Sequence, residues 1–240
     1  MALKREPILK GPIPTGCQTL DMLLMGGLPT KALTLIYGEA ETGKTTFTIQ
    51  CAVNCARMGQ KAIIIDSDGS FSSQRLIQIA QQDYEETAEK IILVRPENFE
   101  QQSYVIDQLE NILTEKTLLI AIDTVTSLYR AELAKNPKKT FKLNRELNRQ
   151  LAYLSQLAKT RNLAVLATSQ VRSIIQTKNL AIEPVATRVL KFWADIVINF
   201  KPTPQPHVFR AILEKHPEQK RLKACFFKIT QTGIAITDEK

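Results

Sequence analysis

The sequence has few of the residues that mark secreted, metal-rich or membrane-spanning proteins. Its 240 residues include four cysteines, two histidines and one tryptophan. The longest apolar runs, such as 118–122 and 163–167, have about five residues, whereas a helix that spans a bilayer needs about 18. The first 13 residues combine charges with prolines and lack the apolar segment of a secretory signal. These absences predict a soluble intracellular protein.

The cysteines are too few for a disulfide scaffold, and their spacing does not favour a metal site. Cys51 and Cys55 are four positions apart, on one face of a predicted helix, and neither His207 nor His216 is near them in the sequence. We therefore expect buried thiols in a reducing compartment.

The composition is that of a globular chain with a surplus of positive charge. Hydrophobic residues make up 44% and charged residues 23%, which is enough apolar material for a sizeable core. There are 32 lysines and arginines against 24 aspartates and glutamates, which gives a net charge of +8. A basic balance favours polyanionic partners such as nucleic acid, although many basic proteins bind none.

The order of apolar segments predicts an α/β fold with a mostly parallel sheet. Continuously apolar segments alternate with amphipathic stretches, as in βαβ units whose strands are covered on both faces. The predicted strands are Leu33–Tyr37, Ala62–Asp66, Ile91–Val94, Leu118–Asp123 and Leu163–Ser169, and the predicted helices are near 44–58, 72–82, 98–114 and 140–160. A C-terminal antiparallel extension of one sheet edge is predicted by Ala194–Phe200, Val208–Glu214 and Ala224–Thr230. Residues 1–13 are expected to form a flexible basic arm and 14–240 a single domain.

The segment that follows the first predicted strand is a phosphate-binding motif. It reads Gly38-Glu39-Ala40-Glu41-Thr42-Gly43-Lys44-Thr45 and fits G-x-x-x-x-G-K-[ST] between a strand and a helix, the context that the motif requires. The glycines let backbone N–H groups point at phosphate oxygens beside the helix N-terminus. We expect Lys44 to reach the β- and γ-phosphates, Thr45 to hold Mg²⁺, and Thr46 to complete the nucleotide contacts.

Three polar residues near the ends of later strands are candidates for chemistry at the phosphates. Asp123 ends an apolar strand, where a carboxylate can hold Mg²⁺. Asp68 follows Ala62–Asp66 and, if that strand neighbours the strand before the phosphate loop, can polarise the attacking water; a turn-forming aspartate is the alternative. Gln170 follows Leu163–Ser169 and can sense the γ-phosphate and signal to the segment after it.

The order of these motifs resembles the RecA-type recombinase family. The likeness begins at Pro14-Thr15-Gly16 and Leu20-Asp21 and continues through the phosphate loop, 65–71, 74–76, 123–132, 169–171, 213–216 and 227–230. It covers about residues 14–234. Segments 96–99, 184–186 and 213–216 favour an archaeal paralogue reduced to the ATPase core over the true archaeal recombinase. The resemblance implies a RecA-type P-loop ATPase core that uses ATP and Mg²⁺.

The resemblance also implies roles for single residues. Lys44 and Thr45 correspond to the triphosphate and Mg²⁺ ligands, and Asp123 to the acid behind the Mg²⁺. Arg75 corresponds to the arginine that stacks on adenine. Gln170 corresponds to a sensor glutamine that begins a second DNA-binding loop at about 171–186, and the first such loop is expected at about 130–140.

Three features depart from the family pattern. Asp68 stands where glutamate is usual and is one methylene shorter, so slow hydrolysis is expected. Only 13 residues precede the core, without a helix-hairpin-helix domain, and they contain no Phe-x-x-Ala motif of the kind that links subunits. Filament formation and autonomous strand exchange are therefore not expected.

Segment 135–145 predicts a DNA-binding surface. It has five positive charges and no acid, and it leads into a helix whose leucines share one face while Lys142, Arg145 and Arg149 lie roughly opposite. An ordinary solvated face is the alternative. With few aromatics there besides Tyr129 and Phe141, we expect sequence-tolerant binding that favours single strands. The candidate DNA contacts are Arg130, Lys138, Lys139, Lys142, Arg145, Arg172 and Lys178.

Three functions follow from these patterns. The first is an ATP-binding, DNA-binding accessory protein of homologous recombination and repair with weak ATPase activity, located in the cytoplasm with the nucleoid. The second is a nucleotide-gated regulator of protein partners, such as a recombinase, that touches DNA only incidentally. The third, a full recombinase or helicase motor, is disfavoured by the missing N-terminal elements. Trp193 and the phenylalanines near it are expected in the core.

Overall fold

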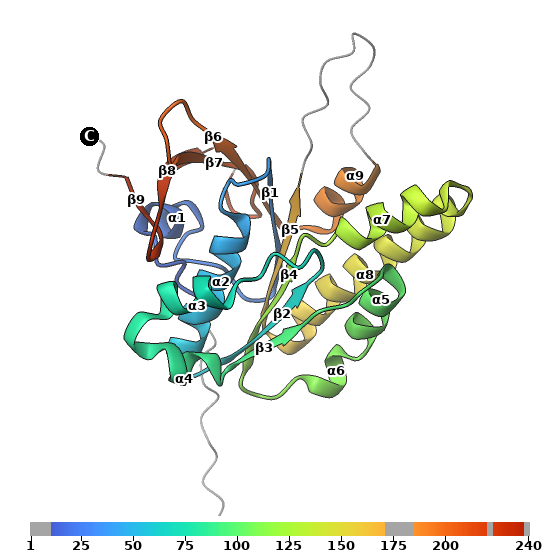
Figure 1. Ribbon diagram of the computed structural model, residues 1–240, viewed down its shortest axis with the longest axis horizontal. Helices are drawn as coiled ribbons and strands as arrows, with labels where there is room; N and C mark the ends of the chain where they lie inside the picture. Colours follow the sequence, from blue (N-terminus) through green and yellow to red (C-terminus); the bar gives the residue numbers. More distant parts are fainter. Residues whose placement is uncertain (1–10, 171–184, 220–222, 238–240) are drawn as a thin grey trace, which may run out of the picture.

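The computed structural model describes residues 11–170, 185–219 and 223–237, which form a nine-stranded sheet with helices on both faces (Figure 1). The strand order is β3-β2-β4-β5-β1-β6-β7-β8-β9. The first six strands in this order are parallel, and the last three continue antiparallel. The predicted fold class is therefore confirmed. The strands are β1 (Ala32–Gly38), β2 (Lys61–Asp66), β3 (Ile91–Val94), β4 (Thr117–Asp123), β5 (Ala164–Gln170), β6 (Ile196–Pro202), β7 (Val208–Lys215), β8 (Lys223–Thr230) and β9 (Gly233–Ile236).

The helices divide between the two faces of the sheet in chain order (Figure 1). Four pack on one face: α1 (Gln18–Leu23), α2 (Lys44–Arg57), α3 (Ser73–Ala80) and α4 (Tyr84–Ala88). Five cover the other: α5 (Phe99–Asp107), α6 (Leu109–Ile112), α7 (Ser127–Lys135), α8 (Thr140–Arg161) and α9 (Val185–Trp193). Within the described residues, no helix is long and apolar enough to cross a membrane.

The central strands are apolar throughout because each one supplies two cores. In β1, Leu33 and Leu35 pack with the α5–α9 layer, whereas Ile36 packs with the α1–α4 layer. In β2, Ile63 and Ile64 divide between the two layers in the same way. Side chains alternate between the faces of a strand, so a strand covered on both faces needs apolar residues at successive positions. Two layers thus hold the carboxyl ends of the parallel strands at one edge.

The position of β2 differs from the conditional prediction for Asp68. This strand does not neighbour β1; it pairs with β3 and β4, and β4 and β5 separate it from β1. Pairing across a sheet is non-local, so chain order alone does not give strand order. The parallel arrangement nevertheless brings the ends of β1, β2, β4 and β5 to the same edge.

Other differences concern the C-terminal strands and the connection after β4. Strand β6 is parallel to β1 although it is antiparallel to β7, and β9 adds an antiparallel strand that was not predicted. The expected first DNA-binding loop at 130–140 is largely helical, since α7 extends to Lys135 and a 3₁₀ turn spans Pro137–Lys139. The run 131–135, with two alanines, a leucine, a glutamate and a lysine, favours helix.

The described part of the chain includes a buried residue that was assigned to the N-terminal arm. Ile13 is fully buried, and its backbone exchanges two hydrogen bonds with Leu28. Residues 1–10 of the predicted arm lie outside the described part of the chain. Cys51 and Cys55 are buried on α2, as expected.

Candidate functional site

The loop between β1 and α2 has no room for a side chain at two of its positions. Gly43 caps α2 with a φ of +88°, and a Cβ built there would lie 2.7 Å from the Ile229 side chain. A Cβ on Gly38 would lie 2.2 Å from the backbone oxygen of Phe200. Both contacts are closer than a side chain allows, and a positive φ costs an L-residue energy as well. The hollow beside the loop has a volume of about 180 Å³ and is lined by Glu41, Gly43, Lys44, Thr45, Thr46 and Ile229.

Lys44 is the buried cation of this loop. Its Nζ donates to the backbone oxygen of Glu39 at 2.5 Å and to the hydroxyl of Thr42 at 3.4 Å. Burial lowers the pKa of Lys44, and the nearby carboxylates of Asp123 and Asp68 oppose that shift. A cation held in a loop of inward-pointing amides is suited to bind a phosphate group.

Asp123 is the acceptor on which three hydroxyl groups converge. Thr45 Oγ1 donates to Asp123 Oδ2 at 2.6 Å, Ser70 Oγ donates to the same oxygen at 3.0 Å, and Thr168 Oγ1 donates to Oδ1 at 2.5 Å. Burial raises the pKa of Asp123, while the bonds from Thr168 and Thr45 act in the opposite direction. The structure therefore joins the first turn of α2 to the end of β4 at one carboxylate.

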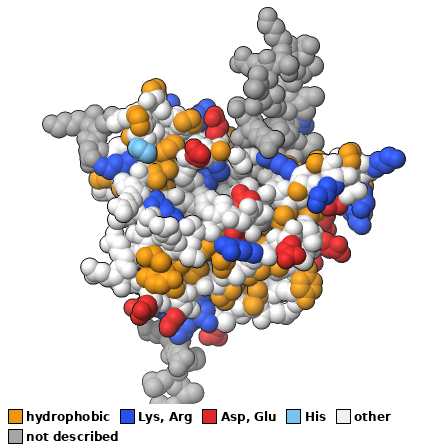
Figure 2. Space-filling model, in the orientation of Figure 1, with side chains coloured by type: hydrophobic (Ala, Val, Ile, Leu, Met, Phe, Trp, Pro, Cys, Tyr) orange, Lys and Arg blue, Asp and Glu red, His pale blue; other side chains and the backbone are white. Residues whose placement is uncertain are grey.

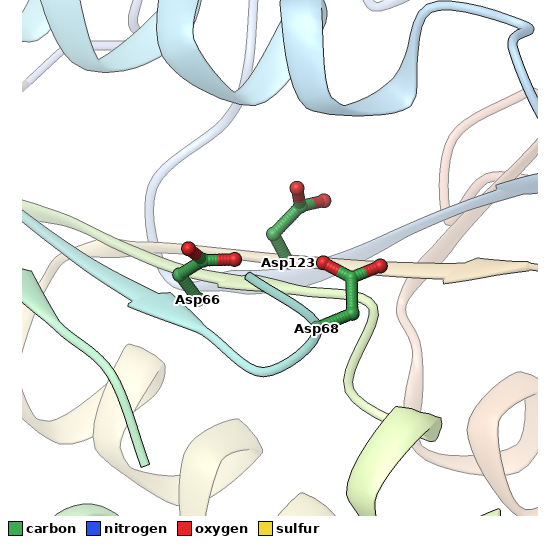
Figure 3. Close-up of side chains that lie close together, drawn as sticks. All are labelled: Asp66, Asp68 and Asp123. Carbon is green, nitrogen blue, oxygen red and sulfur yellow. The ribbon is translucent and has the colours of Figure 1, made fainter. Parts of the chain in front are cut away.

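Two further carboxylates lie beside Asp123 at the same edge of the sheet (Figure 3). Asp66 ends β2 directly opposite Asp123 in the register, and Asp68 lies in the loop that follows. Oxygen atoms of the three carboxylates lie within 4.8 Å of one another. Asp66 is neutralised by Arg95, whose Nε is 3.1 Å from Oδ2. Asp68 is exposed, and its Oδ1 accepts the Ser70 N–H at 3.2 Å.

The donor atoms at this edge suit Mg²⁺. The Thr45 hydroxyl and the Asp123 carboxylate are hard oxygen ligands next to a phosphate-type loop, and magnesium is usually held by one or two carboxylates together with substrate phosphates. Ser67, between the two aspartates of the β2 end, has a buried hydroxyl oxygen without a hydrogen-bond partner among the described residues. A buried polar atom without a partner calls for an explanation, and a bound ion or water is one.

Gln170 lies beside the first residue of the phosphate loop, on the neighbouring strand. It ends β5 in register with Gly38, the last residue of β1. Its backbone oxygen accepts a 2.7 Å hydrogen bond from Arg130 Nη2, which connects the end of β5 to α7. Two of the predicted residues, one for phosphate sensing and one for DNA, are therefore in direct contact.

Arg75 is held by the turn between β8 and β9. Its Nη1 donates to the Gln231 oxygen at 2.7 Å and to Gln78 Oε1 at 3.1 Å, and its Nη2 donates to the Thr230 oxygen at 2.8 Å. Burial lowers the pKa of Arg75. The turn follows Ile229, which lines the hollow beside the phosphate loop.

The predicted DNA contacts at 138–145 lie on the protruding end formed by α7 and α8. Figure 2 shows Lys and Arg side chains gathered there, at the right of the view. Lys138, Lys139, Lys142 and Arg145 are exposed. Tyr129 is buried, and its hydroxyl donates to Asn144 Oδ1. Arg172 and Lys178 lie outside the described residues.

Two expectations about this side of the molecule were wrong. Arg149 is not part of a free basic stripe: its Nη1 is 2.7 Å from Asp107 and its Nη2 is 2.7 Å from Glu146, and these hydrogen bonds raise its pKa. Phe192 is 72% exposed rather than in the core. Trp193 is half-buried, with its indole N–H donating to Asn148. Position on a helix wheel reveals the Glu146 partner, three positions before Arg149, but not Asp107, which comes from another element.

Several residues of the site were not among the candidates. Asp66, Ser70, Arg95 and Thr168 surround the carboxylates, and only Asp66 had a visible signal, since it ends an apolar strand just as Asp123 does. A larger hollow of about 330 Å³, lined in part by Lys31, Asp195 and His216, lies at the opposite edge, where β1 and β6 begin. It contains none of the predicted site residues.

Comparisons with known proteins agree with this geometry. The Rad51 family model matches residues 4–236. Proteins named "DNA repair and recombination protein RadB" are 34% identical over 220 residues in Methanococcus maripaludis strain C5 (92% of this chain, 98% of the relative) and 34% identical over 221 residues in Methanocaldococcus jannaschii (91% and 100%). The solved structure titled "Crystal structure of the RadB recombinase" has a TM-score of 0.79 at 30% identity, covering 94% of this chain and all of that one. The expected likeness to the archaeal core-only paralogue, RadB, is confirmed, and the chain belongs to the Rad51 family.

Proposed function

We propose that the chain is an ATP-binding and DNA-binding accessory protein of homologous recombination and DNA repair, with weak ATPase activity. In this proposal, residues 14–240 form a single ATPase core domain. The protein is located in the cytoplasm, in association with the nucleoid. The observation that carries it is the 2.6 Å hydrogen bond from Thr45 to Asp123, formed beside Lys44 at the start of α2. The RadB relatives are named DNA repair and recombination proteins, which supports the same role for this chain.

In the proposed ATP site, the amides from Gly38 to Thr46 surround the phosphates and Lys44 binds the β- and γ-phosphates. Thr45 and Asp123 would hold Mg²⁺, which neutralises phosphate charge when bound. Arg75 would stack on the adenine: the turn carbonyls bind its guanidinium through N–H groups that lie in its plane, and such bonds do not use its π face.

In the proposed hydrolysis step, Asp68 accepts a hydrogen bond from the attacking water and polarises it. The step is slow because aspartate reaches one methylene less far than glutamate. Gln170 senses the γ-phosphate, and the bond between Gln170 and Arg130 supports a path from the phosphates to α7.

The proposed DNA surface is the exposed cluster Lys138, Lys139, Lys142 and Arg145, with Arg130, Arg172 and Lys178 as further contacts. Phosphate contacts of this kind bind DNA without regard to sequence. A second function, a nucleotide-gated regulator of a recombinase or another protein, is favoured by one observation: Asp68 Oδ1 accepts the Ser70 N–H, the contact expected of an aspartate that shapes its turn.

A titration of the full chain against a labelled single strand tests the proposal, in a salt series with and without ATP and Mg²⁺. We expect the affinity to fall linearly on a log–log plot and to change when ATP is added. The control is an unrelated protein of similar pI. Binding no tighter than the control's, at every salt concentration and with no response to ATP, would favour the regulatory function.

A further inference from the structure

Phe141 is an aromatic side chain that the fold leaves in water. It lies in the first turn of α8 and is 81% exposed, the largest value among the exposed large hydrophobic residues of the described chain. The ring pairs and cation–π contacts of the described residues do not include it. A phenylalanine gains stabilisation when it is buried, so its exposure here does not serve the core.

Residues close to Phe141 in the sequence carry positive charge, and segment 135–145 contains no acid. Arg145 follows Phe141 by four positions on α8 and so lies on the same side as the ring, whereas Lys138 lies in the 3₁₀ turn Pro137–Lys139 that leads into the helix. No ion pair of Lys138, Lys142 or Arg145 occurs within the described residues. The next acid along the chain, Glu146, is bound by Arg149, and these hydrogen bonds lower its pKa.

We propose that Phe141 stacks on an unpaired base of a single-stranded nucleic acid whose phosphates are bound by Lys138 and Arg145 on either side of the ring. This inference rests on the DNA binding proposed above. It adds recognition of an unpaired base, which the cations that bind phosphates do not provide. Side chains four positions apart on a helix are about 5–6 Å apart at Cβ, so Arg145 is at short range from the ring. Lys138 lies three residues before the ring, in the turn that leads into the helix. Every base has a π face, so stacking tolerates any sequence.

The same arrangement predicts a preference for single strands over duplexes. A duplex offers phosphates to Lys138 and Arg145, but its bases are stacked on one another and present no free face to Phe141. Tyr129 cannot serve in its place, because it is buried and its hydroxyl is bonded to Asn144. Phe141 is therefore a specificity-determining residue, whereas the neighbouring cations bind either form.

Substitutions at position 141 separate stacking from charge. The full chain and its Phe141→Ala, Phe141→Leu and Phe141→Tyr variants are titrated with a single strand and with a duplex of the same sequence. We expect Phe141→Ala to weaken single-strand binding roughly 5- to 150-fold, the range for one stacked base. Duplex affinity and the salt slope should not change. Phe141→Tyr should keep the affinity because it keeps the ring, and Phe141→Leu should resemble the alanine variant.

The fold should tolerate these changes, since the side chain is exposed and alanine and leucine favour helix more than phenylalanine does. Stacking is overturned if Phe141→Ala binds the single strand as the parent does, or if Phe141→Leu retains full affinity. It is also overturned if Phe141→Ala changes only the oligomeric state of the protein, since the ring would then lie in a contact between two copies of the chain. Replacing Lys138, Lys139 and Lys142 together distinguishes failure of the stacking proposal from failure of the proposed DNA binding. If that variant loses affinity for single strand and duplex while Phe141→Ala loses none, the DNA-binding proposal stands and the stacking proposal fails.

Discussion

The carboxyl edge of the sheet and the end of the α7–α8 pair are built in opposite ways. At the edge, Lys44 and Asp123 are buried, and three hydroxyl groups donate to the Asp123 carboxylate. At the helix end, Lys138 and Lys142 are exposed, and Phe141 is in water. The first region is organised before any ligand binds, because Lys44 and Asp123 already have hydrogen-bond partners. The second offers charge and one ring but few internal contacts, so its geometry depends on what binds there.

This difference separates two kinds of function. A buried, prearranged site can distinguish a phosphate group by position, because its charges act at low dielectric and are not screened. An exposed cationic surface attracts any polyanion, with a strength that falls as salt rises. We expect substitutions at the sheet edge to have large effects that salt changes little, and substitutions at the helix end to have smaller effects that salt changes strongly.

The largest expected effect is that of Lys44→Ala, which should abolish detectable ATP binding. Lys44 is the buried cation of the phosphate loop, and its loss leaves the nearby Asp123 and Asp68 carboxylates to repel the phosphates. Binding of a labelled ATP analogue measures the effect, and circular dichroism checks the fold. Lys116→Ala is the matched control: it removes one exposed cation just before β4, at the opposite edge of the sheet. ATP binding as tight as the parent's would disprove the proposed phosphate site.

The next effect concerns hydrolysis alone. Asp68→Ala should lower turnover by about 10²-fold or more, as the loss of a general base typically does, with little change in ATP affinity. Asp68→Glu should keep or raise turnover, because glutamate restores the reach that is usual in the family. Steady-state phosphate release measures both variants. If the alanine variant turns over at the parent's rate, Asp68 is a turn residue without a role in hydrolysis. The carboxyl edge of the sheet would then differ from the helix end only in what it binds.

The contrast between the buried carboxyl edge and the exposed helix end also explains how far the sequence predicts each of them. The segment from Gly38 to Thr45 was recognisable because its function depends on covalent spacing, which the sequence contains. The contact of Asp66 and Asp123 was not, because it depends on β2 pairing with β4, and strand pairing is non-local. At the helix end, exposure and ion pairing decide the role of a side chain. Lys142 and Arg149 look alike in the sequence, yet a carboxylate of α5 binds only Arg149.

A smaller effect is expected at the helix end. Replacing Lys138, Lys139 and Lys142 together with alanine should weaken single-strand binding about equally for all sequences. If all three bind phosphates, the log–log salt slope should flatten by about 2, from about 0.7 per contact. The control replaces Lys61, Lys90 and Lys116, which removes the same charge at the opposite edge of the sheet. Equal slopes in the two variants would reduce this surface to an ordinary solvated face and would direct attention to Arg172 and Lys178.

The smallest effect distinguishes two arginines on the same helix. Arg149→Ala removes the ion pairs with Asp107 and Glu146, which are partly exposed, so the free energy of unfolding should fall by about 0.2–1 kcal/mol, and by less at high salt. The DNA salt slope should stay at the parent's value. Arg145→Ala should do the reverse, leaving stability unchanged and flattening the slope by about 0.7. Urea denaturation and the salt titration measure the two quantities. If Arg149→Ala flattens the slope as much as Arg145→Ala does, the ion pairs of Arg149 open when DNA binds, and the basic surface extends further along α8 than the structure of the free chain indicates.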